Sequence, residues 1–514
     1  MSLISCLNIA QQALSVNQAA ISVVSNNIAN VDTPGYSKWR VNQAAVINYT
    51  PSAGNKMSLA ESGSGVTIES VQRYSNSYLQ SYYWQENSSA AYMDKYATIA
   101  SNIEDLTNEL NDTGLSEALT NFYAAADALN DDPSDITARE NYIQQAQNVT
   151  VVFNNMSKNL NDMKETLVGD PNKPGTLEAS EIVSQAEAVN SLLDQIAKVN
   201  FDIVKTNSGT SSSPALLDKR DALVSQLTSY MPIEAKVNSN GTINISLGDY
   251  KLVAGSQVSS YLEVESGNAS TPAIINLVDK NGAPVASNVN SDIDAGSIGA
   301  IFTASGNSNG SNLTINGVLA QLNKMASNFA SVLNSIQTTV GYPSGDGTTP
   351  MAIDTATGLL IPATENIFQT NDGTATITAA NISVNSDIIN DPNLIAAARV
   401  ADVTDTTAVG NNTNMTLVLS SRTEPNAGLQ NLSFEGYLAS VVSGIGSDVN
   451  NINSNTENQN LVLNEIQMKL SSATGVNLDE ELVDMVKYQR AYQAAARIFS
   501  VCNDLMGELV HLGE

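Results

Sequence analysis

Apolar residues near the start of the chain recur at alternating steps of four and three positions. They are Leu3, Leu7, Ala10, Leu14, Asn17, Ile21, Val24, Ile28 and Val31, with Asn17 the one polar member. This spacing is the seam of a coiled coil, so it predicts a long amphipathic helix. The helix should end at Thr33-Pro34-Gly35-Tyr36, because proline at the second position and glycine at the third favour a type II turn.

The same spacing returns at the end of the chain. The second series comprises Leu478, Leu482, Met485, Gln489, Tyr492, Ala496, Phe499, Asn503, Met506 and Val510. Two such helices at opposite termini are suited to lie side by side. We therefore predict an assembly interface formed by large apolar members of the two seams, namely Leu3, Leu7, Leu14, Ile21, Val24, Ile28, Leu482, Met485, Tyr492, Phe499 and Met506.

Between the ends the pattern changes twice. Helical spacing dominates up to Tyr230, apart from short strand-like runs between Trp39 and Val71 and a flexible Ser-rich linker at 207–213. After Pro232, alternating runs broken by Asn-Gly pairs predict strands. The fold class expected is multidomain α+β, with long terminal coiled-coil helices, a helical bundle and β-rich domains inserted in the middle of the chain.

The predicted domains are nested. Residues 1–35 and 476–514 form the terminal coiled-coil domain, and 36–231 with 425–475 form the helical bundle, to which a helix at 313–340 returns. A β-rich domain covers 232–312, and a second, variable β-containing insertion covers 341–424. The two ends of the chain therefore meet.

The N-terminal helix carries no charge, because residues 1–31 contain no Lys, Arg, Asp or Glu. Its length of about 28 residues corresponds to about 42 Å. Burying its seven large apolar seam residues yields roughly 10 to 20 kcal/mol, whereas fixing the backbone costs roughly 1 to 2 kcal/mol per residue. We therefore expect the ends to become ordered when neighbouring copies enclose them. The alternative is that the two seams pack only against each other.

Composition narrows the function classes. Lys plus Arg number 23 and Asp plus Glu number 52, and the formal charge of −29 repels nucleic acid and anionic lipid surfaces. The single histidine, His511, is the fourth residue from the end of the chain. A catalytic triad or a zinc site is therefore not expected, and neither is a cofactor. The sequence indicates a structural protein, not an enzyme.

Cysteine usage and hydropathy leave further alternatives open. Cys6 and Cys502 both resemble small apolar helix residues, although pairing of the termini would bring them near each other. No run of about 18 apolar residues predicts a membrane span. The start of the chain also lacks the charged region of a secretory signal. If the protein is secreted, we expect no cleaved signal peptide.

Two acidic motifs each allow a structural and a functional interpretation. Ser291-Asp292-Ile293-Asp294-Ala295-Gly296 hints at a calcium loop, but an EF-hand starting at Asp292 needs Gly at position 297 and Glu at position 303, where Ser and Thr stand. A plain turn is expected there. Asp479, Glu480 and Glu481 favour the positive end of the helix that follows them, or alternatively contact a partner.

Four segments resemble one protein family. Asn26-Asn27-Ile28-Ala29-Asn30-Val31-Asp32-Thr33-Pro34-Gly35-Tyr36 resembles the N-terminal signature of the rod, hook and hook-associated axial proteins of the bacterial flagellum. Gly475-Val476-Asn477-Leu478-Asp479-Glu480-Glu481 and Tyr488-Gln489-Arg490-Ala491-Tyr492-Gln493-Ala494 are similar to the C-terminal signature of the hook-associated members. Leu216-Leu217-Asp218-Lys219-Arg220-Asp221-Ala222-Leu223 also resembles the hook-associated members. The resemblance fades across 341–422.

The resemblance implies an extracellular structural protein that leaves through the flagellar type III export apparatus. It implies assembly on the distal end of the hook and a connection from there to the filament. The implied partners are further copies of the chain in a ring, the hook protein, a second junction protein and a cytoplasmic export chaperone. Two alternatives remain: another axial protein similar to the hook subunit, and an extracellular adhesin built on the β-rich insertions.

Overall fold

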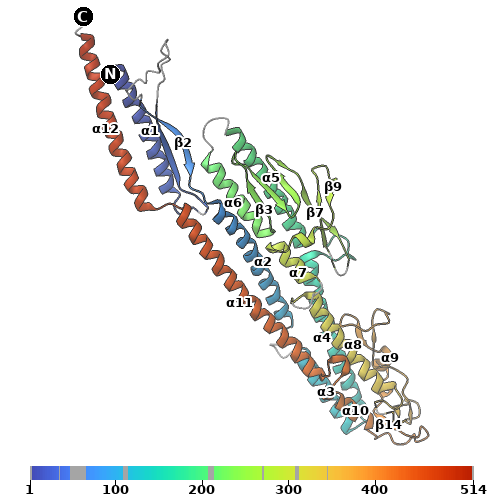
Figure 1. The fold of residues 1–514 in the computed structure, drawn as a ribbon. Helices are drawn as coiled ribbons and strands as arrows, with labels where there is room; N and C mark the ends of the chain where they lie inside the picture. Colours follow the sequence, from blue (N-terminus) through green and yellow to red (C-terminus); the bar gives the residue numbers. More distant parts are fainter. Residues whose placement is uncertain are drawn as a thin grey trace.

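The molecule is long and narrow, and both of its termini lie at the same end (Figure 1). The computed structural model describes residues 3–511 except 34, 47–64, 108–113, 207–212, 269–270, 272, 307–311 and 344. The predicted linker at 207–213 therefore lies outside the described residues, apart from Ser213. The α+β class expected from the sequence is confirmed: long helices form the axis of the molecule, and several small sheets are attached along it.

The terminal end of the molecule is built from two helices and a hairpin. Helix α1 (Leu3–Ala29) lies against α12 (Leu478–His511), and the antiparallel strands β1 (Trp39–Ala45) and β2 (Val66–Arg73) pack on α1. The predicted turn after α1 is present: the Tyr36 N–H donates to the Thr33 carbonyl at 3.1 Å, and Gly35 adopts a φ of +79°. Pro34 lies outside the described residues.

The helical bundle follows. Two of its long helices, α2 (Ser77–Thr107) and α11 (Phe434–Thr474), lie side by side and connect the terminal end to the body (Figure 1). The remaining bundle helices are α3 (Leu115–Asp131), α4 (Ile136–Val168), α5 (Glu181–Thr206), α6 (Pro214–Tyr230) and α8 (Ile315–Thr338). The helix expected at 313–340 is thus α8.

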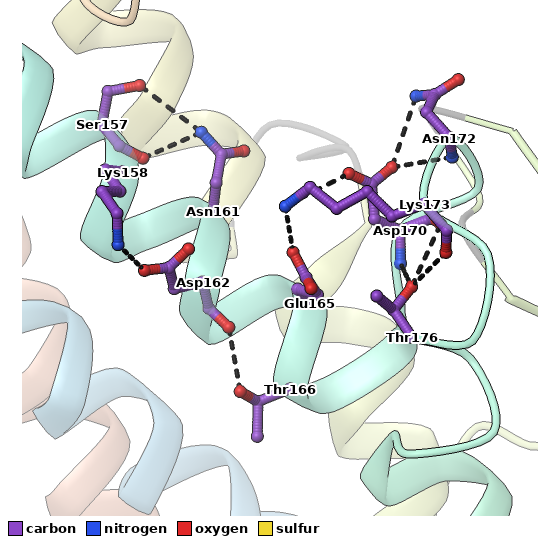
Figure 2. Close-up of polar contacts among 10 residues, drawn as sticks. All are labelled: Ser157, Lys158, Asn161, Asp162, Glu165, Thr166, Asp170, Asn172, Lys173 and Thr176. Atoms are coloured by element: carbon purple, nitrogen blue, oxygen red, sulfur yellow. Dashed lines mark hydrogen bonds and ion pairs between the residues drawn. The ribbon is translucent and has the colours of Figure 1, made fainter.

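The connection from α4 to α5 shows how a loop in the body is closed (Figure 2). Gly169 ends α4 with a φ of +72°, and a Cβ at this position would lie 2.7 Å from the Leu177 Cα, so only glycine fits without strain. The Thr176 hydroxyl accepts a hydrogen bond from the Asp170 N–H at 2.9 Å, and Lys173 pairs with Glu165 of α4. The loop is therefore held against its own helix.

The first inserted region contains two antiparallel sheets. One sheet has the order β3-β4-β5-β6, formed by Glu234–Val237, Ile243–Leu247, Tyr250–Ala254 and Gln257–Val258. The other has the order β7-β8-β9, formed by Tyr261–Ser266, Ala273–Val278 and Pro284–Ala286. The start of the acidic segment 291–296 belongs to the short 3-10 helix η1 (Asn290–Asp292), and α7 (Gly296–Ser305) then ends the region.

The second inserted region lies at the far end of the molecule (Figure 1). Its strands are short and form a sheet of order β11-β10-β14 and a separate β12-β13 pair, with the bounds Thr349–Ile353 (β10), Leu360–Pro362 (β11), Phe368–Thr370 (β12), Ile382–Val384 (β13) and Ala398–Val400 (β14). Its helical pieces are α9 (Ser386–Asn390), η2 (Pro392–Leu394), α10 (Thr413–Ser421) and η3 (Ala427–Leu429).

Two large apolar cores stabilise the body, and three helices, α4, α8 and α11, contribute to both. The core nearer the terminal end joins α2, α5, α6 and α7 to the two sheets of the first inserted region. The distal core is centred on Phe329, which is fully buried and lies 5.4 Å, ring centroid to ring centroid, from Phe122, Phe368 and Phe434. Because the same three helices are packed in both cores, a movement of one core displaces the other, and we expect the body to move as one rigid unit.

Candidate assembly surface

The face of α1 that meets α12 is lined mainly by small residues. Cys6 and Asn27 both contact α12, so the residues at helical spacing between them lie on the same face. These residues are Ala10, Ala13, Asn17, Ala20 and Val24. Small side chains allow two helix axes to approach closely, and the Cys6 and Cys502 Cα atoms are 6.5 Å apart.

The predicted α1 seam is therefore divided between two neighbouring stripes. Ala10, Asn17 and Val24 belong to the face toward α12, and Ala10 and Val24 are buried. The large members Leu3, Leu7, Leu14, Ile21 and Ile28 follow one flank of that face and remain half-buried. Their remaining exposed surface is available to a neighbour.

Helix α12 shows the same division. Ala495 and Cys502 are buried, while Met485, Phe499 and Met506 at helical spacing beside them are half-buried. Of the predicted residues, Leu482 is 51% exposed and Tyr492 is 37% exposed. Other exposed apolar residues of α12 are Leu478, Val483, Val486, Ile498, Val501, Leu505 and Leu509. Helix α12 thus carries apolar side chains along its whole length that this chain itself leaves uncovered, interspersed with charged residues.

The free end of the helix pair carries a covalent connection. Cys6 and Cys502 form a disulfide between α1 and α12, although 496 positions separate them in the sequence. Of the two possibilities left open for these cysteines, the structure shows the pairing. No local sequence signal could distinguish it, because the bond depends on how two distant helices are rotated.

At the opposite end of the pair, Asn27 is fully buried and uses its whole side-chain amide. Its Nδ2 donates to Glu481 Oε2 and to the Trp39 carbonyl, both at 2.9 Å. Its Oδ1 accepts from the Tyr36 hydroxyl at 2.9 Å and from the Trp39 N–H at 3.0 Å. One side chain therefore connects α1, α12, the turn and the first residue of β1.

Lys38 completes the contact with α12. Its Nζ lies 2.9 Å from Glu481 Oε1 and 3.0 Å from Glu480 Oε2, and its N–H donates to the Thr474 carbonyl at the end of α11. Burial by itself lowers the pKa of Lys38, but the hydrogen bonds to the two carboxylates outweigh it, so the pKa lies above its ordinary value. Burial also raises the pKa of Tyr36, with Asp218 and Glu481 adding to the effect. Both groups thus keep their protons at neutral pH.

A second polar cluster connects the hairpin to the body. Trp39 Nε1 donates to Asp218 Oδ2 at 3.0 Å, and Arg73 Nη1 lies 2.9 Å from Asp218 Oδ1. Arg73 also pairs with Asp221, which Arg220 contacts at 2.6 Å. Burial raises the pKa of Asp218, although Trp39 and Arg73 oppose the effect. We call these residues, together with Asn27, Tyr36, Lys38 and Glu481, the joint.

Sequence reasoning missed the joint as a unit. Asp218, Arg220 and Asp221 stand out in the sequence only within the segment that resembles the hook-associated proteins. The hairpin partners of Asp218 and Asp221 lie 145 to 179 positions away. The acidic trio at the start of α12 was assigned to the helix dipole or to a partner. Two of its members, Glu480 and Glu481, contact Lys38 of the same chain, and Asn477 accepts from the Asp479 N–H at 3.0 Å.

Within the described part of the chain, no group of three His, Cys, Asp or Glu side chains is placed to hold a metal ion. None of the helices searched there is both long and apolar enough for a membrane span. The side chain of His511 lies outside the described residues. What the terminal end offers is an apolar surface on a firmly attached helix pair.

Family models match three parts of the chain. The model described as the helical domain of flagellar hook-associated protein FlgK matches residues 100–348. The model of the C-terminal region of the basal body rod FlgEFG proteins matches 470–512, and that of the flagella basal body rod protein matches 7–36. The two rod models thus fall on α12 and α1, and the hook-associated model falls on the body.

Full-length relatives agree with these matches. Flagellar hook-associated protein 1 of Bacillus subtilis (strain 168) is 27% identical over 540 residues, covering 98% of this chain and 97% of the relative. The protein of the same name from Salmonella typhimurium is 25% identical over 577 residues, covering 99% and 100%. A solved structure, described as the flagellar hook junction protein FlgK from Burkholderia pseudomallei, matches in fold with a TM-score of 0.55 at 14% identity, covering 76% of this chain and 100% of that one.

Proposed function

We propose that this chain, a relative of flagellar hook-associated protein 1 and a structural protein of the bacterial flagellum rather than an enzyme, forms the junction between hook and filament. The observation that carries the proposal is the uncovered apolar side of α12, on the segment matched by the rod protein family. A surface of this kind on a flagellar axial protein is suited to packing against neighbouring subunits.

The energetics favour a closed ring of copies. Nine large apolar side chains of α12 are between 37% and 68% exposed. Covering what remains exposed yields roughly 7 to 13 kcal/mol per chain, at about half of the value for full burial of each side chain. Association costs about 4 to 15 kcal/mol, so a single contact is marginal. A single pair covers only part of this surface, whereas in a ring every chain has a neighbour on both sides and the whole surface is covered.

The terminal helix pair, predicted from residues 1–35 and 476–514, then forms the inner layer of the junction. The joint fixes this pair to the body, whose inserted sheets extend outward. The hook protein lies on one side of the ring and the second junction protein on the other. Before export by the type III apparatus, a cytoplasmic chaperone covers the exposed apolar side chains of α12.

The test uses Val486→Asp, because Val486 is 55% exposed and its replacement should leave the free chain folded. Purified variant is mixed with hooks isolated from cells lacking this protein, and sedimentation and electron microscopy measure binding. We expect unchanged melting and loss of hook capping, because the introduced charge must be desolvated in the interface. The matched control is Val403→Asp, which is 48% exposed at the far end of the molecule and should cap normally. Normal capping by Val486→Asp would refute the proposal.

A second candidate is an axial subunit similar to the hook protein, favoured by the two rod family models on the terminal helices. The two candidates differ in how growth stops. A hook-like subunit polymerises alone into long tubes, whereas a junction protein stops at a short ring. Electron microscopy of the concentrated purified chain distinguishes them.

A further inference from the structure

The only two cysteines of the chain, Cys6 and Cys502, are placed opposite each other by the fold. Cys502 is 4% exposed and Cys6 is half-buried, so both lie within the helix contact rather than on open surface. Buried, paired positions on two helices are where a disulfide fixes one helix against the other. The position of the disulfide along the helix pair indicates which part of α1 it holds against α12.

The helix pair is held differently at its two ends. Near the body, Asn27 contacts Glu481 and Lys38 contacts both Glu480 and Glu481, all without covalent bonds. Near the termini, the disulfide joins the fourth residue of α1 to a residue in the last third of α12. Between them the α1 face offers mostly alanines, which bury little apolar area. The free end of the pair therefore depends on the disulfide.

We propose that Cys6 and Cys502 form a redox-controlled lock that closes α1 onto α12 outside the cell. In the reducing cytoplasm both residues are thiols, and the helix pair opens at its free end. Outside, the disulfide closes the pair and presents the apolar side of α12 in a fixed orientation. That the disulfide forms only after export rests on the proposed function. A disulfide spanning 496 positions closes nearly the whole chain into a loop, and such a loop does not pass through the export apparatus as a single strand.

The closing step needs an oxidant, and a low-molecular-weight disulfide such as oxidised glutathione supplies it. The Cys6 thiolate, which is the more accessible, attacks one sulfur of that disulfide, forms a mixed disulfide and releases one thiolate. The Cys502 thiolate then attacks Cys6 Sγ, forms the Cys6–Cys502 bond and releases the second thiolate. Two protein thiols are oxidised and one small disulfide is reduced to two thiols, so atoms and electrons balance.

The experiment compares one full-length chain in two redox states, so that no substitution is needed for the main comparison. Purified protein is treated either with oxidised glutathione or with a reducing phosphine, and iodoacetamide labelling in denaturant followed by mass spectrometry counts free thiols. Amide hydrogen exchange is then measured across α1 and α12. We expect no labelled thiol in the oxidised chain and two in the reduced chain. We also expect exchange in the first half of α1 to be about tenfold or more slower when oxidised.

The control is the double variant Cys6→Ala with Cys502→Ala, which should exchange like the reduced chain under both treatments. Exchange in the distal core around Phe329 should be the same in every sample. Two labelled thiols after oxidation, or equal exchange of α1 in both states, would overturn the lock. These outcomes are read on the free chain, so they leave the hook-capping test of the proposed function unaffected.

Discussion

Replacing Asn27 with alanine removes the one side chain that contacts α12, the turn and β1 at the same time. The substitution leaves four polar groups without their partner: Glu481 Oε2, the Tyr36 hydroxyl, and the N–H and carbonyl of Trp39. A buried polar group left unpaired costs about 1 to 3 kcal/mol, and water entering the vacated space offsets part of this. At about 1 kcal/mol for each group, the joint loses about 4 kcal/mol.

Native-state hydrogen exchange is the suitable assay, because the chain has several cores and a single unfolding transition is not expected. A loss of about 4 kcal/mol raises the opening constant of the joint by roughly a thousandfold. Amides in the second half of α1 and the first turns of α12 should therefore exchange faster by that factor. Amides of the distal core should not change.

Asn30→Ala provides the matched control. Asn30 is half-buried. Its Nδ2 donates to the Asn26 carbonyl at 2.9 Å and to Asn26 Oδ1 at 2.7 Å, and its Oδ1 accepts from the Thr33 hydroxyl at 3.3 Å. The loss of this side chain should cost less than about 1 kcal/mol, because water replaces these contacts. If Asn27→Ala and Asn30→Ala change the exchange of α1 by equal factors, the joint does not hold the helix pair and the reasoning is wrong.

Three further predictions concern the joint and the body. The raised pKa of Lys38 means that its stabilising contribution is complete below about pH 10 and is lost as pH rises through the folded-state value. The melting temperature should therefore fall more steeply above about pH 10 in the wild type than in Lys38→Gln, and equal slopes would contradict this. Arg139 is 1% exposed and donates to the carbonyls of Pro133 and Ile395 at 2.7 Å, so Arg139→Ala should destabilise the distal core by about 3 kcal/mol or more in urea unfolding, and a loss below about 1 kcal/mol would count against it. Gly296→Ala places a Cβ against the Met231 backbone nitrogen and should lower the free energy of unfolding by about 3 kcal/mol or more. Gly175→Ala, also at positive φ but in open space, should lower it by about 1 kcal/mol in the same urea measurement. Equal losses of stability would exclude the close contact as the cause.

The sequence predicted the terminal helices well because their signal is local. Steps of four and three identify α1 and α12, and the Thr33-Pro34-Gly35-Tyr36 motif marks the turn that follows α1. The absence of charge in residues 1–31 is likewise read directly from the chain. The strand pair β1 and β2 was predicted less completely, as loops with an occasional strand, since its strands pair across the segment 46–65.

The sequence pattern did not predict how α1 and α12 are rotated about their own axes. Two neighbouring stripes of α1 are both apolar, and a heptad pattern does not say which one the partner covers. Ala10, Val24 and Leu482 were all placed in the seams; the structure buries Ala10 and Val24 but leaves Leu482 half exposed. Small residues decide the question, because they allow the closest approach between helices and so place Cys6 against Cys502.

The sequence by itself thus determined that the chain has two amphipathic ends, the N-terminal one without charge in residues 1–31, around an α+β body. Only the tertiary structure decided which faces of those ends meet, that Cys6 bonds to Cys502, and that Asn27, Trp39, Arg73 and Asp218 form one polar joint. The physical reason is range. Helical periodicity arises from neighbours a few positions apart, whereas the joint and the disulfide require contacts between residues that the chain separates by up to 496 positions and that only packing brings together.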